Sequence, residues 1–117
     1  MYVALLMLLF QAGPAVPLPE GQQVWYGRDV TRESSTNGWF RQDDYPPQAR
    51  RRHEQGRAVV TTLVSADGTP TACWVQTSSG YPDLDVISCQ LILRRGAFTR
   101  TKGDYTWTMP VRWSLGN

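Results

Sequence analysis

Few side chains in this 117-residue sequence have the chemistry of a catalytic group, and their settings argue against an enzyme. His53 is the only histidine, so any serine–histidine–aspartate triad must use it, yet it lies among arginines where a base is poorly sheltered. The serines of Ser78-Ser79-Gly80 lack the Gly-x-Ser-x-Gly pattern of a nucleophile elbow and suit a turn that leads into a helix. Because no nucleophile, base and orienting group come together, we expect no enzymatic activity; a histidine-dependent hydrolase is the one enzyme alternative.

The acidic and metal-binding residue types give no stronger indication of chemistry. Asp83 and Asp85 have the types of a catalytic carboxylate pair, but near the start of a helix acidic residues more often cap it or favour its dipole. One histidine and two cysteines are too few for a multi-ligand zinc site. We therefore expect no metal site and no cofactor.

The N-terminus has the features of an export signal. Residues 1–10 are almost wholly apolar and are followed by small residues up to Ala15, although no lysine or arginine precedes them. A short apolar core before a small-x-small pattern is typical of a secretory signal, and the alternative is a buried element of the fold. We interpret residues 1–15 as a signal peptide or the remnant of a membrane anchor, 16–38 as a proline-containing tether and loop-rich lead-in, and 39–117 as the folded domain.

Cys73 and Cys89 are the only cysteines, and an even count in an exported chain favours a disulfide. Two buried free thiols and a redox pair are the alternatives, although redox cysteines are usually close in sequence, as in Cys-x-x-Cys. A bridge closing a loop of about 16 residues contributes on the order of 3 kcal/mol. Such a bridge would join a strand to the helix that follows it.

Composition limits the kinds of partner. Lysine and arginine number 12 against 10 aspartates and glutamates, a formal net charge of +2, so nucleic acid is not the expected partner. The length and a hydrophobic content of 41% fit one globular domain. No stretch reaches the roughly 18 apolar residues of a membrane-spanning helix.

Apolar spacing and turn residues predict five elements in the body of the chain. They are a helix over residues 48–55 that ends at Gly56, strands over 57–65 and 71–77, a helix over 83–95 and a strand over 105–115. Asp67-Gly68 suits a hairpin turn between the first two strands, and residues 23–26 are a candidate for a further short strand.

These elements predict an α+β fold of the order αββαβ. The hairpin makes its strands antiparallel, and placing the last strand beside the first keeps every pairing antiparallel. We expect a three-stranded antiparallel sheet with two helices packed on one face and the last strand at an open edge. Pro110 fits an edge strand or a bulge, because it lacks an N–H. We expect Trp74 and Trp107 to be at least partly buried.

Residues 39–115 resemble the C-terminal domain of the TonB family, and a cysteine-bearing branch of that family has cysteines at the positions of Cys73 and Cys89. No single motif is strong, but their order and spacing together are fairly specific. The similar segments are Asp43-Asp44-Tyr45-Pro46-Pro47-Gln48-Ala49-Arg50, Gln55-Gly56-Arg57-Ala58-Val59-Val60, Asp67-Gly68, Ser78-Ser79-Gly80, Leu84-Asp85, Arg94-Arg95-Gly96-Ala97-Phe98 and Val111-Arg112-Trp113.

The resemblance implies a periplasmic domain that couples the inner-membrane proton-motive force to outer-membrane transporters. It implies that the last strand pairs with a peptide from the N-terminal segment of a transporter, by β-strand addition. The residues expected to form this edge are Tyr105, Thr106, Trp107, Thr108, Met109, Val111 and Arg112. An inner-membrane proton-channel complex is a further partner if the chain is anchored, and an open edge can also pair with a second copy as a homodimer.

One alternative function remains open. Only the brief stretch from Pro14 to Pro19 corresponds to the long proline-rich spacer of a full energy transducer. The alternative is a free-standing periplasmic module with a structural or inhibitory role and no part in transport.

Overall fold

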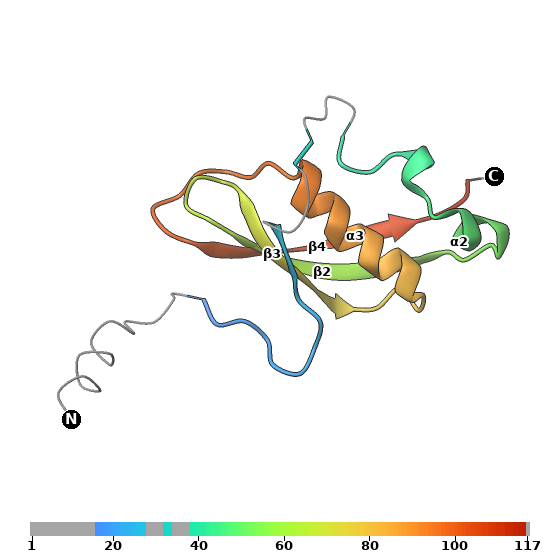
Figure 1. Cartoon of the computed structure of the whole chain (residues 1–117), viewed down its shortest axis with the longest axis horizontal. Coiled ribbons are helices and arrows are strands. Elements are labelled where there is room, and N and C mark those ends of the chain that lie inside the picture. The colour runs from blue at the N-terminus through green and yellow to red at the C-terminus, as the bar shows by residue number, and fades with distance from the viewer. Residues whose placement is uncertain (1–15, 28–31, 34–37, 117) are drawn as a thin grey trace.

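The computed structural model describes residues 16–27, 32–33 and 38–116 (Figure 1). The expected signal peptide or anchor at 1–15 lies outside these residues. No helix in the described ranges has both the length and the apolar character to cross a membrane. The elements in chain order are β1 (Trp25–Tyr26), a 3-10 helix η2 (Gln42–Asp44), α2 (Pro47–Arg51), β2 (Gly56–Val64), β3 (Pro70–Thr77), α3 (Pro82–Arg95) and β4 (Tyr105–Trp113).

The strands form one antiparallel sheet in the order β1-β3-β2-β4. The order expected for the three long strands is confirmed, but the expectation of a three-stranded sheet is wrong. The fourth strand is β1, in which Trp25 pairs with Cys73 and Tyr26 with Ala72 along the outer side of β3. Two residues are too few to show an alternating pattern, and their pairing depends on a partner almost fifty positions away, so the sequence alone did not place them in the sheet.

The first predicted helix is shorter than expected. Helix α2 ends at Arg51, and His53 takes a left-handed conformation with φ of 56° that turns the chain toward β2. Gly56 does not terminate the helix but opens β2, where a side chain would place its Cβ 2.5 Å from the carbonyl oxygen of Ser79. The glycine therefore serves a close approach of two backbones. Helix α3 begins at Pro82, one residue before the predicted start, and ends at Arg95 as predicted.

One hydrophobic core lies between the sheet and the helices, and α3 crosses the sheet on this side (Figure 1). Ala58 and Val60 of β2 point into it, together with Ala49 of α2, so both helices share one face of the sheet. The disulfide between Cys73 and Cys89 joins β3 to α3 inside this core, with both cysteines fully buried. This confirms the predicted bridge. The bridge closes a loop of 16 residues and so stabilises the fold mainly by restricting the unfolded chain.

A buried arginine ties the lead-in segments to the end of α3. The Arg95 side chain is only 4% exposed and donates hydrogen bonds to both carboxylate oxygens of Asp44, to Glu33 Oε2 and to the carbonyl of Trp39. Arg32 adds hydrogen bonds to the carbonyls of Leu93 and Gly96. These contacts hold η2 and the chain on its N-terminal side against the end of α3.

This cluster predicts how stability depends on pH. Burial acts to raise the pKa of Asp44, but the hydrogen bonds from Arg95 and from the backbone N–H of Arg41 outweigh it and leave the pKa below the ordinary 3.8. A lowered carboxyl pKa stabilises the fold above the unfolded-state value, and that contribution is lost as the pH falls through the folded-state value. In urea titrations we expect nearly constant stability from about pH 7 to 5 and a loss below about pH 4. In Asp44→Asn the free energy of unfolding should fall less steeply below about pH 4. An equally steep fall in that variant would contradict the role given to the Asp44 carboxylate.

Candidate binding edge on strand β4

Strand β4 forms one edge of the described sheet. Its nine residues pair with β2 in one continuous register from Gly56↔Trp113 to Val64↔Tyr105. In the part of the chain that the structure describes, no strand pairs with the other side of β4. All the residues expected to form the binding edge therefore lie together on one strand, whose outer backbone groups face away from the sheet (Figure 1).

The two ends of β4 are held very differently. Val111 and Trp113 are buried on the helix-covered side, where Trp113 Nε1 donates to Ser88 Oγ at 2.8 Å and the ring contacts Tyr45 edge-on at 5.4 Å. Trp107 lies on the same side of the sheet but is 53% exposed. The expectation that Trp107 is partly buried is wrong, because α3 packs mainly over β3 and β2 and does not extend over this end of β4. Trp74 is buried, as expected.

Alternate residues of β4 turn their backbone groups toward β2 and away from it. The carbonyl of Leu63 in β2 accepts a hydrogen bond from Thr71 Oγ1 of β3 at 3.1 Å. The backbone N–H and carbonyl of Leu63, and those of every second residue of β2 near it, therefore point toward β3. The intervening residues of β2 point their backbone groups toward β4. Their partners on β4, among them Trp107 and Met109, therefore form the main-chain hydrogen bonds to β2. By the same alternation, four residues turn their backbone groups outward: Thr106, Thr108, Pro110 and Arg112.

Pro110 fits this alternation. It pairs with Val59 without a shift in register on either side, so the missing N–H leaves the ladder to β2 intact. Proline is tolerated in a sheet when its nitrogen faces the open side of an edge strand. The expected edge position of this proline is therefore confirmed, and the alternative of a bulge is not observed in the β2–β4 pairing. The outer side of β4 has an acceptor but no donor at this position.

An aromatic hollow of about 440 Å³ adjoins the exposed end of β4. Trp39 and Phe98 form one wall, with ring centroids 5.1 Å apart, and Tyr105 and Trp107 of β4 form the other. Trp39 is one of the four tryptophans that from the sequence could line a peptide or carbohydrate groove, whereas the sequence did not indicate Phe98 as a site residue. Arg95 donates a hydrogen bond to the carbonyl of Trp39, and this bond holds Trp39 beside the end of α3, where its ring contacts Phe98.

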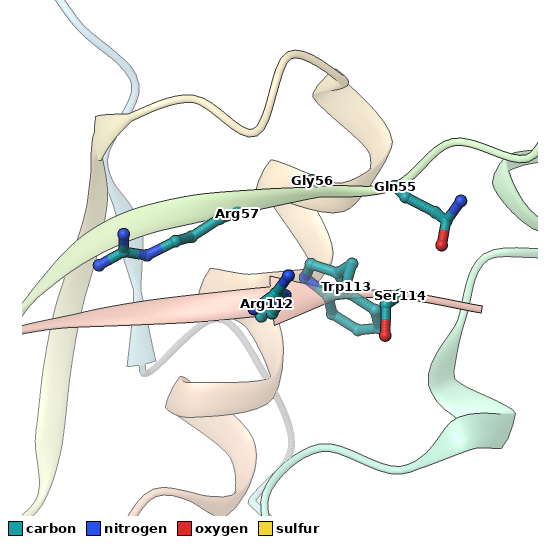
Figure 2. A pocket seen from close by; sticks show the side chains of 6 residues that line it. All are labelled: Gln55, Gly56, Arg57, Arg112, Trp113 and Ser114. Carbon is teal, nitrogen blue, oxygen red and sulfur yellow. The ribbon is translucent and has the colours of Figure 1, made fainter. Parts of the chain in front are cut away.

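A second hollow lies at the other end of the same edge and is positively charged. It has a volume of about 510 Å³ and is lined by Gln55, Gly56, Arg57, Arg112, Trp113 and Ser114. Arg57 of β2 and Arg112 of β4 are direct cross-strand partners, so both side chains project from the face away from the helices. Figure 2 shows their guanidinium groups lying well apart, as two like charges would. Arg57 was not predicted as a site residue, although counting along the pairing from an assumed register would have found it.

The residues first considered for catalysis have structural roles. Ser79 Oγ and its backbone N–H both donate to Asp85 at 2.7 and 2.8 Å, and Ser78 Oγ donates to the same carboxylate. These bonds form the turn that leads into α3, as the sequence indicated. His53 is exposed at the left-handed turn after α2, and no described hydrogen bond joins it to either serine. The described residues thus bring no catalytic set together.

Residues 41–115, nearly two-thirds of the chain, match the family model for the Gram-negative bacterial TonB protein C-terminal. The chain belongs to this family. The match includes β4, both cysteines and Arg57. Domains of the TonB C-terminal family are protein-interaction modules without catalytic groups, which agrees with the roles of the serines above.

A solved structure supports the TonB C-terminal fold. The NMR solution structure of the Helicobacter pylori TonB C-terminal domain is similar at a TM-score of 0.55 and 24% sequence identity, over 62% of this chain and 69% of that one. At this identity the likeness shows the fold and carries no statement about partners. No curated protein gives a significant match to the chain.

Proposed function

We propose that this TonB C-terminal domain binds an extended peptide from the N-terminal segment of an outer-membrane transporter, by β-strand addition to the outer side of β4. The observation that carries the proposal is the free edge of β4, which is firmly paired on one side and open on the other. Family membership supports a role in proton-motive-force-dependent transport and a periplasmic location. An inner-membrane proton-channel complex is the further partner if residues 1–15 anchor the chain.

The backbone of β4 supplies the hydrogen bonds for such a partner. Thr106, Thr108 and Arg112 turn N–H and carbonyl groups outward, and Pro110 turns out a carbonyl alone. A peptide added here gains main-chain bonds at alternate residues, while its own side chains meet the aromatic hollow on one face and the arginines on the other. Main-chain bonds provide the affinity, and the two hollows provide selection among sequences.

An array of synthetic peptides from the N-terminal segments of outer-membrane transporters tests the partner directly. Fluorescence anisotropy against the described domain should give saturable binding for a subset of the peptides. If none binds at millimolar peptide, the transporter partner is excluded and the free-standing periplasmic module becomes the better account. Analytical ultracentrifugation of the domain alone tests the same edge for self-pairing, and a homodimer would compete with the peptides.

Thr106→Pro tests whether β4 is the binding edge. The outward N–H of Thr106 is lost and the proline ring obstructs an incoming strand, while the ladder to β2 is untouched, as it is at Pro110. We expect the melting temperature to stay within a few degrees and peptide affinity to fall at least about tenfold. Anisotropy titration measures the affinity and circular dichroism the melting temperature.

Two further variants control this experiment. Thr106→Val keeps the N–H and removes only the hydroxyl, so its peptide affinity should match that of the unmodified domain. Met109→Pro removes an N–H that bonds to β2, so this variant should be strongly destabilised. Full peptide affinity in Thr106→Pro would place the binding site elsewhere, and a fully stable Met109→Pro would overturn the assigned alternation.

A further inference from the structure

We propose that Arg57 and Arg112 select a partner strand with an acidic side chain, which lies on the face of the sheet away from the helices and at the Arg112 end of β4. This inference rests on the proposed addition of a strand to β4. It goes further by naming the chemistry of one side chain of the partner and the two residues that recognise it.

The arginine pair is unfavourable in the domain by itself. Like charges directly opposite on neighbouring strands repel and destabilise a sheet. Within the described ranges, no carboxylate lies at ion-pair distance from either Arg57 or Arg112, and both side chains are exposed. Other arginines of the domain do have such a partner, namely Arg41, Arg52, Arg94 and Arg95. Arg57 and Arg112 differ from the other arginines without such a partner in lying opposite each other at the edge where a strand is proposed to bind.

The geometry of a sheet places a partner's side chain beside Arg112, on the face that both arginines share. A strand added to β4 lies about 4.8 Å from it, and its residue opposite Arg112 projects from the same face as Arg112 and Arg57. The hollow of about 510 Å³ beside Arg112 is lined by these arginines together with Gln55 and Ser114, whose side chains Figure 2 labels. A glutamate or aspartate at that position would face the Arg112 guanidinium directly, and Arg57 would attract it at longer range from across β4.

Charge complementarity identifies the occupant. An acidic side chain pairs with Arg112 and offsets its repulsion with Arg57, whereas a basic side chain adds a third positive charge. A neutral side chain leaves the repulsion unrelieved. Selection of this kind acts by favouring one chemistry and opposing another at a single position. The aromatic hollow at the other end of β4 lies on the opposite face and does not contribute to it.

The experiment combines protein and peptide variants. The probes are the transporter peptides that bind best in the array, each beside copies in which one acidic residue is replaced by its amide. Against these we test Arg57→Gln, Arg112→Gln and the double variant, with Arg51→Gln as a matched control that removes an exposed positive charge from α2. Affinities are measured at 50 and 300 mM salt, and melting temperatures at one salt concentration.

One acidic position in the peptide should be sensitive to the arginines. Replacing this acidic residue of the peptide by its amide should weaken binding about three- to tenfold, and so should Arg112→Gln in the domain. The amide peptide and the Arg112→Gln domain together should bind no more weakly than either change alone gives. The loss should be smaller at high salt, and Arg51→Gln should have no effect on affinity. The melting temperatures of Arg57→Gln and Arg112→Gln should be unchanged or higher, because repulsion is removed; a lower one would indicate a structural role.

Different failures have different meanings. If peptides bind and Thr106→Pro abolishes binding, but no acid-to-amide copy couples to the arginines, strand addition stands and this inference is overturned. If the amide copies bind more tightly than the acidic peptides, it is overturned as well. If no peptide binds the unmodified domain, both the proposed function and this inference are overturned.

Discussion

Replacing Arg95 by alanine is expected to lower the free energy of unfolding by about 3–5 kcal/mol, the range for breaking a buried ion pair from one side. The Arg95 side chain is almost fully buried and holds both oxygens of Asp44 and the carbonyl of Trp39. Without it, the Asp44 carboxylate stays largely buried with only the backbone N–H of Arg41 as a described partner. The cost arises chiefly from this stranded charge rather than from the lost attraction.

Urea unfolding followed by tryptophan fluorescence measures this effect. Arg94→Ala is the matched control, because Arg94 is the neighbouring residue of α3, is 32% exposed and among the described residues forms an ion pair with Glu33 at 3.6 Å. An exposed pair of this kind contributes less than about 1 kcal/mol. If Arg95→Ala does not fold, Asp44→Asn and Arg95→Lys provide graded weakening of the same contacts. Equal losses in Arg94→Ala and Arg95→Ala would contradict the special role of the buried residue.

The effect of Arg95 should extend to the binding edge. Its hydrogen bond to Trp39 holds one wall of the aromatic hollow, whereas no described contact joins it to β4 itself. We expect a folded Arg95→Lys variant to keep main-chain binding at β4. Selection for side chains that enter the hollow should be weaker in it. The buried arginine is thus a structural residue whose position bears on the proposed specificity.

Removing the disulfide is expected to lower stability by about 3 kcal/mol, from the chain entropy of a 16-residue loop. In a domain of this size that corresponds to a fall of roughly 15 °C in melting temperature. The variant is Cys73→Ala with Cys89→Ala, which also leaves a small space in the core where both sulfurs are fully buried. The expected loss is therefore at least as large as the loop entropy alone.

Thermal unfolding with and without dithiothreitol measures this loss. The unmodified domain should melt at a lower temperature once reduced, and the double variant should be insensitive to the reductant. Peptide binding below the transition should survive in the variant, because β4 pairs with β2 while the bridge joins β3 to α3. A double variant as stable as the parent would show that burial in the core, and not the cross-link, supports this region.

Much of the proposed site follows from short-range patterns. Alternation between Tyr105 and Trp113 marks a strand, and a proline within it indicates an edge, because the lost N–H is tolerated only on an open side. The hairpin around Gly68, with the last strand placed so that every pairing is antiparallel, then puts that strand beside β2. The bridge was predictable because only two cysteines exist. These inferences depend on neighbours in sequence and on topology, so no side-chain packing was needed to make them.

Other features depend on contacts that no local pattern records. Strand β1 consists of two residues that join the sheet only because β3 offers an open edge. Trp107 is exposed because α3 lies over β2 and β3 and stops short of it, although its alternation with Thr106 is the same as that of buried residues.

The sequence by itself thus indicated the chain order of the five longer elements and the edge position of the last strand, because periodicity and turn chemistry are local, and it offered a single possible cysteine pair. Only the tertiary structure decided that Arg57 faces Arg112 and that Trp39 meets Phe98. Those meetings depend on the pairing register and on a buried arginine, whose partners are far apart along the chain. They are the features from which the selectivity of the edge is inferred.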